Sequence, residues 1–205
     1  MRARFLWLGL VVVFSAFSGG ASARSDWFEE RGARAPNGNR LYICHGYSCR
    51  VVTPVTLSTA EIEAIAAPLT AALPDAAAER QAISLSVQTF ERIVGERVGT
   101  GGDLPGMQFG RGRPDQMDCI DEATNTTSLL MALAAHGYLK HHRVLRPSGR
   151  GFFLDGRYPH ATAVVAESAG GVKWAIDSWP RANAEPPVVQ PLSEWRRSRT
   201  GALPS

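Results

Sequence analysis

One continuous stretch, DQMDCIDEATNTTSLLMALAAH from Asp115 to His136, constrains the fold more than any other part of the chain. From Ile120 onward its apolar residues recur at roughly helical spacing, which predicts a buried helix. Asp118 is one of three acidic residues near the start, where negative charge favours the positive end of a helix dipole. Gly137 follows the pattern, at the position where a left-handed cap commonly ends a helix.

Cys119 falls at the first turn of this predicted helix. A helix start lowers the pKa of a thiol and places it at the accessible end of an element, which suits a nucleophile. A free cysteine is also often an ordinary small core residue. Position alone therefore leaves both interpretations of Cys119 open.

The first 23 residues, MRARFLWLGLVVVFSAFSGGASA, have a basic start, an apolar run and a small-residue ending. This pattern is typical of a signal peptide cleaved after Ala23, and the apolar run is too short to span a membrane. We therefore expect a periplasmic or secreted protein, and no lipid membrane anchor, because no cysteine stands at the cleavage site. Loss of Arg2 and Arg4 reduces the formal net charge from +3 to about +1, which argues against nucleic acid as a partner.

The other two cysteines lie close together in LYICHGYSCR, at Cys44 and Cys49. In an oxidising compartment the simple interpretation is a disulfide between them that closes a turn around Gly46. Cys119 is then the odd thiol, which in an exported protein is either reactive or paired with another molecule. The alternative is that Cys44 and Cys49 stay reduced.

The mature chain is expected to form one domain over residues 41–205, after a flexible polar segment over Arg24–Arg40. Ser58 to Glu61 form a capping box that opens a helix, and Pro68 should end that helix near Ala67. Asp75–Val98 is a second, longer amphipathic helix.

Strand composition and turn residues place the remaining elements. Strands are expected at Leu41–Val52 (a strand or hairpin), Leu139–Leu145, His160–Glu167 and Val172–Trp179. Turns are expected at Pro147–Arg150, Asp155-Gly156 and Ser168–Gly171, followed by an irregular proline-rich tail as far as Leu192.

The two strands on either side of Ser168-Ala169 can be paired so that one face is wholly apolar, as a core-facing pair requires. Placing Glu167 opposite Gly170 sets His160 opposite Asp177 on the other face, within cross-strand reach. Because Ser-Ala is a poor two-residue turn, the turn itself does not fix this register strongly.

A cysteine at a helix start and a His–Asp pair on a sheet meet the needs of thiol catalysis. The imidazole accepts the thiol proton, and the carboxylate fixes the tautomer and stabilises the imidazolium. His160 could be an ordinary histidine at a strand start and Asp177 a turn residue, but together with an unpaired Cys119 they favour catalysis. In that case Cys119 should be partly thiolate near neutral pH, and Asp177→Asn should reduce turnover roughly 10⁴-fold, as in a serine-protease triad.

Three other histidines, His136, His141 and His142, compete for the role of base. The adjacent pair His141-His142 could suggest a metal site. No third or fourth ligand stands at a convincing spacing, so zinc is not expected.

Cys119 at a helix start, His160 on one strand and Asp177 on the next resemble the transglutaminase-like cysteine peptidase superfamily, most closely the bacterial transglutaminase-like cysteine proteinases. The resemblance covers about Gln116 to Trp179. It implies an α+β, papain/transglutaminase-like fold, with N-terminal helices and a central helix packed on an antiparallel sheet. It also implies that Cys119 is the nucleophile, His160 the base and Asp177 the orienting acid.

Further site residues follow from the same resemblance. An oxyanion hole is expected from the Cys119 backbone N–H, with Gln116 as a side-chain donor. Family members usually have glycine before Asp-Cys, whereas this chain has Met117. Some members bind calcium through acids just after the nucleophile, where Asp121 and Glu122 stand, although these acids could equally cap the helix. No cofactor is required for the chemistry.

The leading hypothesis is an exported thiol hydrolase, a cysteine peptidase that cleaves amide bonds of a protein or peptide substrate through an acyl-enzyme. Acyl transfer to an amine, as in transglutaminases, uses the same three residues and is the first alternative. The second alternative is a secreted binding domain with the same fold and no catalysis. The sequence does not indicate the oligomeric state.

Overall fold

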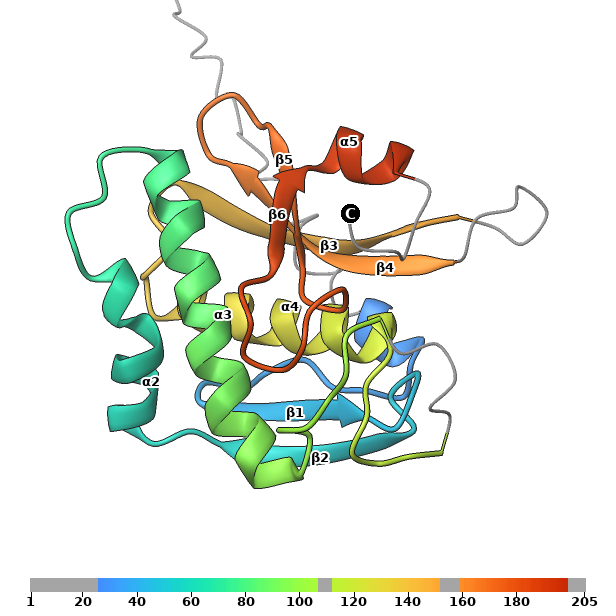
Figure 1. Ribbon diagram of the computed structural model, residues 1–205. Coiled ribbons are helices and arrows are strands. Elements are labelled where there is room, and N and C mark those ends of the chain that lie inside the picture. Colours follow the sequence, from blue (N-terminus) through green and yellow to red (C-terminus); the bar gives the residue numbers. More distant parts are fainter. Residues whose placement is uncertain (1–25, 107–111, 152–158, 199–205) are drawn as a thin grey trace, which may run out of the picture.

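The computed structural model describes residues 26–106, 112–151 and 159–198. These residues form two antiparallel sheets with a long helix between them (Figure 1). In chain order the elements are β1 (Arg40–His45), β2 (Val51–Thr56), α2 (Thr59–Ala66), η1 (Ala67–Leu69), α3 (Ala76–Val98), α4 (Cys119–Ala135), β3 (His142–Arg150), β4 (His160–Glu167), β5 (Lys173–Asp177), β6 (Val188–Pro191) and α5 (Leu192–Arg197).

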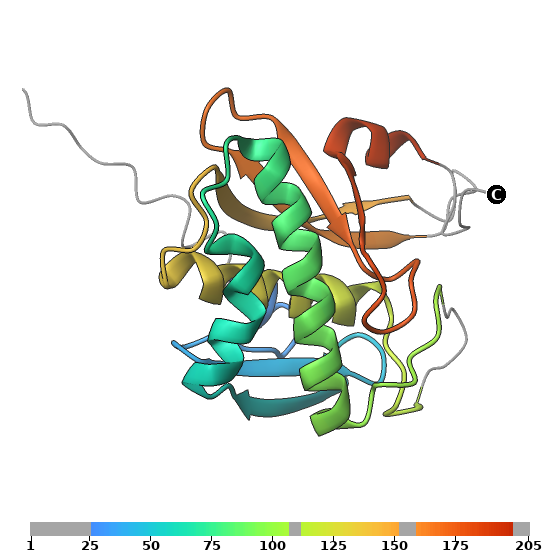
Figure 2. The same ribbon diagram turned by 60° about the vertical axis from the view of Figure 1, so that its left-hand side comes forward.

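Helix α4 is the centre of the fold. It lies between the β1–β2 hairpin and the four-stranded sheet, whose strand order is β3-β4-β5-β6, and α2 and α3 cover one side of this arrangement (Figures 1 and 2). Its fully buried Leu129, Leu130 and Leu133 join the main core, to which both sheets and both covering helices contribute. The predicted mixture of α and β elements, with a central helix on an antiparallel sheet, is therefore confirmed.

The first two helices begin and end where local signals place them. The Ser58 side chain accepts from the Glu61 N–H while the Glu61 carboxylate accepts from the Ser58 N–H, so the predicted capping box is formed. α2 gives way to the short η1 turn at Pro68, which cannot continue an α-helix. α3 begins after an Asp75 cap and ends at Gly99, whose φ of 81° is left-handed.

Replacing the α2 cap should lower stability modestly. Ser58→Ala leaves the Glu61 N–H without its side-chain acceptor, and we expect a loss of about 1 kcal/mol in the free energy of unfolding. Urea unfolding followed by circular dichroism measures this loss. The control is Thr59→Ala at the neighbouring exposed residue, which should leave the unfolding midpoint almost unchanged. Equal midpoints for the two variants would contradict the capping role of Ser58.

The β4–β5 hairpin forms, but with a register two residues away from the predicted one. Ala163 pairs with Ile176, and the Glu167 N–H donates to the Val172 carbonyl at 2.8 Å. The turn therefore has four residues and ends in Gly170 and Gly171, whose φ values of 81° and 70° are left-handed. His160 is consequently not directly opposite Asp177, although a shift of two residues keeps every side chain on its predicted face.

Two other predictions for the sheet are wrong. β3 begins at His142 and runs on to Arg150, through the residues expected to form a turn. Its register is irregular between Leu145 and Ser148, where Pro147 interrupts an edge strand, a place where proline is tolerated. The tail expected to be irregular contains β6, which pairs with β5.

The described part of the N-terminal segment, residues 26–40, is packed against the fold, contrary to the flexibility expected for Arg24–Arg40. Residues 26–29 form a helical turn, and Trp27 and Phe28 are only 4% and 1% exposed. The predicted signal peptide and the Asp155-Gly156 turn lie outside the described residues. Among the residues that are described, no helix is long and apolar enough to cross a membrane.

Candidate functional site

Cys119 is the first residue of α4 and is held by the cap of that helix. The Asp118 carboxylate accepts from the N–H groups of Ile120 and Asp121, both at 3.0 Å. This cap fixes the backbone on both sides of the cysteine. Cys119 is a free cysteine and as a residue is 6% exposed, and its Sγ lies 3.9 Å from the carbonyl oxygen of Pro159, just before β4.

His160 and Asp177 form a buried pair on the four-stranded sheet. His160 begins β4 and Asp177 ends β5, and His160 Nε2 lies 2.6 Å from Asp177 Oδ2. The indole N–H of Trp195 donates to the same oxygen at 2.7 Å. His160 Nδ1 is buried and has no hydrogen-bond partner among the described residues. The pair therefore holds one ring nitrogen and leaves the other available.

Two tryptophans enclose the His160 ring. The ring centroids of Trp179 and Trp195 lie 4.7 and 5.3 Å from that of the imidazole, each tilted by 40°. Both indoles are fully buried. They shield the His160–Asp177 hydrogen bond from water, which strengthens it.

A cavity of about 320 Å³ joins the thiol and the imidazole. Cys119, Pro159 and His160 lie on one part of its wall. Trp27 and Arg31 of the N-terminal segment line it as well. The cavity is large enough to admit a small part of a substrate beside the thiol, against a wall that His160 also lines.

The resting thiol is neutral, contrary to the expected thiolate. Burial, together with the nearby carboxylates of Asp118 and Asp177, raises the pKa of Cys119 to about 12, while the backbone N–H of Ala161 acts in the opposite direction. The positive end of the α4 dipole lowers the pKa of this thiol by less than burial raises it. Any chemistry at Cys119 must therefore remove the thiol proton during the reaction rather than before it.

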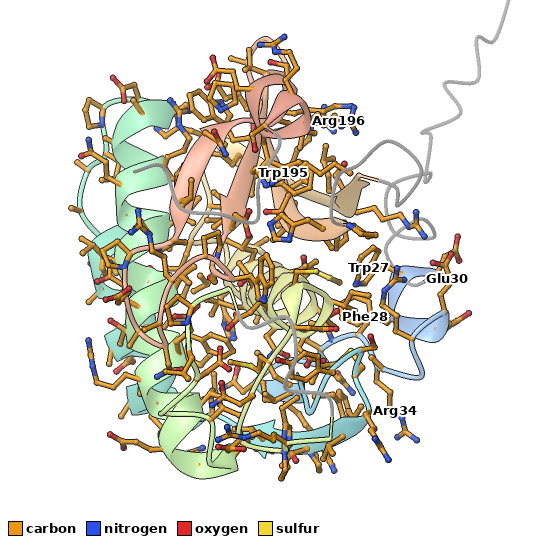
Figure 3. The ribbon with its side chains drawn as sticks, turned by 45° about the vertical axis from the view of Figure 1, so that its right-hand side comes forward. Trp27, Phe28, Glu30, Arg34, Trp195 and Arg196 are labelled. Carbon is orange, nitrogen blue, oxygen red and sulfur yellow. A yellow bond between two sulfur atoms is a disulfide. The ribbon has the colours of Figure 1, made fainter. Side chains whose placement is uncertain are left out.

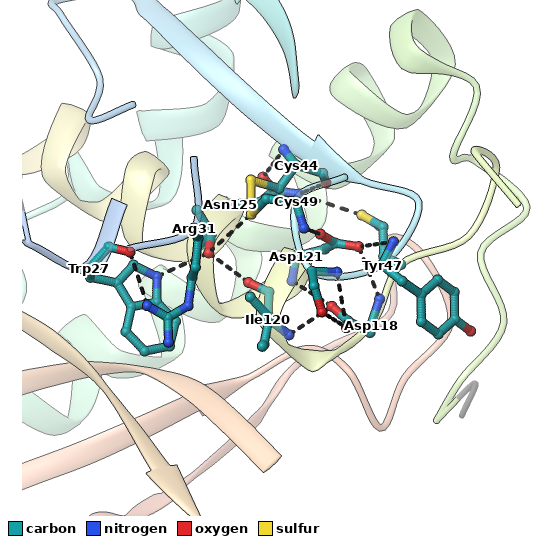
Figure 4. Close-up of a disulfide and its surroundings, with 12 residues drawn as sticks. Trp27, Arg31, Cys44, Tyr47, Cys49, Asp118, Ile120, Asp121 and Asn125 are labelled. Carbon is teal, nitrogen blue, oxygen red and sulfur yellow. Dashed lines mark hydrogen bonds between the residues drawn. A yellow bond between two sulfur atoms is a disulfide. The ribbon is translucent and has the colours of Figure 1, made fainter. Parts of the chain in front are cut away.

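Asp121 anchors the β1–β2 hairpin turn. Residues 46–49 all have left-handed φ values, between 56° and 77°, so successive backbone N–H groups point to one side. The Asp121 carboxylate accepts from the N–H groups of Tyr47 and Cys49 at 2.8 and 2.6 Å, and the turn is closed by the predicted Cys44–Cys49 disulfide (Figure 4). The hairpin turn is thereby fastened to the helix start that carries Cys119.

Glu122 lines a small cavity together with Glu91 of α3. It is buried, and this burial together with the charges of Glu91 and Asp103 raises its pKa well above the usual value. Within the part of the chain that the structure describes, Glu122 and Asp121 do not form part of one close group of potential metal ligands. Among the described residues, the one close group of three potential metal ligands is Cys44, Cys49 and Asp121, and its sulfurs are joined to each other. The contacts give calcium binding no support, and it stays a prediction.

Gln116 lies apart from the candidate cavity. Its side-chain N–H groups donate to the carbonyls of Gly102 and Asp115 at 3.0 and 3.1 Å, and its Oε1 accepts from the Leu104 N–H. These bonds tie the loop before α4 together. They occupy the donors that an oxyanion role for Gln116 would need.

The competing histidines are also engaged elsewhere. His142 Nδ1 lies 2.7 Å from the fully buried Glu79 carboxylate, which also accepts from the His141 N–H. His136 is exposed at the end of α4 and bonds Asn39. Of the described histidines that were considered as bases, only His160 reaches the cavity beside Cys119.

Four residues of the site region were not predicted from the sequence: Trp27, Arg31, Trp179 and Trp195. Each reaches the site from a segment far from Cys119 in sequence. The sequence carries no spacing signal for such contacts. The adjacent Trp27 and Phe28 in a mainly polar N-terminal segment are the one feature of the sequence that hints at packing there.

No family model matches this chain, and neither a curated protein nor a solved structure matches it. Any function must therefore be argued from the geometry of its own residues.

Proposed function

We propose that the protein is an exported thiol hydrolase that cleaves amide bonds through an acyl-enzyme formed on Cys119. The observation that carries the proposal is the orientation of His160. Its Nε2 is held by Asp177, and its buried Nδ1 has no partner among the described residues, beside a cavity that Cys119 also lines. A base with one fixed nitrogen and one open nitrogen beside a thiol is what nucleophilic catalysis needs.

The chemistry follows from a neutral thiol. Cys119 Sγ attacks the substrate carbonyl while its proton passes to His160 Nδ1, and Asp177 stabilises the imidazolium that forms. The imidazolium then protonates the leaving amine, which breaks the amide bond and leaves an acyl group on sulfur. Water, activated by the same imidazole, releases the acid and restores the thiol.

The start of α4 can stabilise the oxyanion that forms during attack on the substrate carbonyl. The Asp118 carboxylate caps the N–H groups of Ile120 and Asp121 and not that of Cys119. The Cys119 N–H, at the positive end of α4, is therefore our candidate donor for the developing oxyanion. The Gln116 side chain is not part of this proposal.

The chain order also supports a transglutaminase-like cysteine peptidase. The thiol starts a central helix, the histidine starts one strand, and the acid ends the next strand of an antiparallel sheet. The Cys44–Cys49 disulfide is compatible with an exported protein. This assignment rests on geometry and chain order alone.

Acetylation by p-nitrophenyl acetate tests the proposal without knowledge of the natural substrate. We expect the ester to acetylate Cys119, with release of p-nitrophenolate, and the acetyl group to be lost again by hydrolysis. His160→Ala should slow acetylation by about 10²-fold, the contribution of a general base. Intact-protein mass spectrometry follows the acetyl group, and peptide mapping locates it.

His136→Ala is the matched control, because it removes an exposed histidine that lies outside the cavity. It should acetylate at the wild-type rate. Equal rates for wild type and His160→Ala would overturn the triad and favour a non-catalytic domain. Methylamine in the buffer distinguishes the two reactions, since N-methylacetamide in preference to acetate would indicate an acyltransferase.

A further inference from the structure

The N-terminal segment supplies one wall of the cavity beside Cys119. The indole N–H of Trp27 donates to Thr124 Oγ1 on α4 at 3.0 Å, which fixes this segment against the helix that carries the thiol. Trp27 and Phe28 pack in one apolar cluster with Cys119 and Trp179. Figure 3 shows Trp27 and Phe28 on the side of this segment that faces the rest of the fold.

Arg31 is held flat on this wall. Its guanidinium carbon lies 3.3 Å from the centroid of the Trp27 ring, and its Nη1 donates to the Trp27 carbonyl at 3.0 Å. The side chain is 21% exposed and lines the cavity. Its Nε is buried without an acceptor among the described residues. The structure therefore presents a preorganised guanidinium on the wall of the cavity that Cys119 also lines.

The charge around Arg31 is not balanced by its acidic neighbour. Glu30 accepts from Arg31 at 3.0 Å, but both of its carboxylate oxygens also accept from Arg146 at 2.7 Å. Two guanidinium groups thus share one carboxylate. Glu30 therefore neutralises only part of the charge of these two groups, which leaves Arg31 able to attract an anion.

We propose that the cavity selects substrates carrying a carboxylate close to the scissile amide, and that Arg31 binds this carboxylate. The proposal rests on the proposed function, because it assigns the substrate class of the same site. Arginine and carboxylate match in geometry through two parallel N–H donors, which gives both attraction and orientation. The carboxylate can come from an acidic side chain or from the end of a peptide chain.

Alkylation of Cys119 by iodoacetate and by iodoacetamide tests the proposal directly. The two reagents form the same carbon–sulfur bond with loss of iodide, and differ in carrying a carboxylate or a neutral amide. We expect the ratio of the iodoacetate rate to the iodoacetamide rate to be about tenfold higher for the protein than for glutathione. A protein ratio equal to or below that of glutathione would overturn the proposal without any variant.

Substitutions then assign the effect to Arg31. Arg31→Gln should reduce the ratio to that of glutathione, and Arg31→Lys should give an intermediate value, because it keeps the charge and loses the planar donors. Arg34→Gln is the matched control, since Arg34 is exposed and lies well away from Trp27 (Figure 3). An unchanged ratio in folded Arg31→Gln, as judged by its thermal unfolding, would contradict the role of Arg31.

The ratio separates this proposal from the proposed function. His160→Ala should slow both reagents to the same extent and leave the ratio unchanged, so a protein without catalysis can still show carboxylate binding.

Protection of Cys119 against iodoacetamide then identifies the source of the carboxylate. Acetyl-Ala-Ala carries a C-terminal carboxylate, acetyl-Ala-Glu-Ala-amide carries a side-chain carboxylate, and acetyl-Ala-Ala-amide is the neutral control. If the neutral peptide protected Cys119 as well as the two acidic peptides do, the proposal would be contradicted.

Discussion

Asp177→Asn should lose far less of the esterase activity than Asp177→Ala. The reason is that Asp177 Oδ2 accepts two hydrogen bonds at once, from His160 Nε2 and from the Trp195 indole N–H. An indole N–H can only donate, so the group that faces it must be an oxygen. In Asp177→Asn the amide oxygen should therefore occupy this position, with the amide NH₂ turned away.

This orientation keeps His160 in the productive tautomer. With an oxygen facing it, Nε2 still carries the proton and Nδ1 remains free to accept the proton of Cys119. The roughly 10⁴-fold loss in a serine-protease triad arises because the asparagine imposes the wrong tautomer. Here we expect Asp177→Asn to lose less than about 10²-fold and Asp177→Ala to lose about 10³- to 10⁴-fold.

The measurement is turnover of p-nitrophenyl acetate by the wild type and both variants, with circular dichroism as the check on folding. Trp195→Phe should have a small effect by itself. Combined with Asp177→Asn it should lower activity towards that of Asp177→Ala, because the amide is then free to turn. If Asp177→Asn is already as inactive as Asp177→Ala while Trp195 is present, the indole does not orient residue 177.

The predicted helix start at Cys119 agrees with the structure because its causes are local. An acidic cap, a helical apolar period and a following glycine all lie within about twenty residues. The shared face of His160 and Asp177 was predictable for a related reason: alternation along a strand survives a register error of two residues. The register itself was not predictable, because it depends on whether the turn takes two residues or four.

The enclosing residues could not be predicted from local pattern. Trp27 donates a hydrogen bond to Thr124, and Trp195 donates one to Asp177. Both bonds join residues too far apart in sequence for a periodic pattern to predict them. The protonated thiol was missed for the same reason. Helix position predicts a low pKa, but the opposing burial is created by the N-terminal segment and by β4, which the sequence does not place beside Cys119.

Thermal stability should fall as the pH rises from about 5 to about 8, because several carboxyl groups are buried away from cations. Burial raises the pKa of Glu91 from 4.5 to about 7, with a further contribution from the charge of Asp103, whose own pKa is also raised to about 7. Glu122 faces Glu91 from α4 and shifts in the same direction. Glu91 accepts from the Ala184 N–H, and its Oε1 has no hydrogen-bond partner among the described residues.

The sign follows from proton linkage. A carboxyl group with a raised pKa binds its proton more tightly in the folded state than in the unfolded state. For Glu91, the resulting contribution to the free energy of unfolding is fully present below the unfolded-state pKa of about 4.5. It is lost as the pH rises through the folded-state pKa of about 7. At about 1.4 kcal/mol per pKa unit, Glu91 alone contributes on the order of 3 kcal/mol between these limits.

Glu91→Gln isolates this contribution, since glutamine is neutral at every pH and its amide oxygen can still accept from the Ala184 N–H. We expect its unfolding midpoint to exceed that of the wild type at pH 8 and to approach it at pH 5, so that its pH profile is flatter. Glu96→Gln on the exposed side of α3 is the matched control and should follow the wild-type profile. Differential scanning calorimetry between pH 5 and pH 8 gives all three curves. Parallel profiles for the wild type and Glu91→Gln would show that Glu91 does not carry its proton in the folded protein near neutral pH, and that its buried position is stabilised in the charged form.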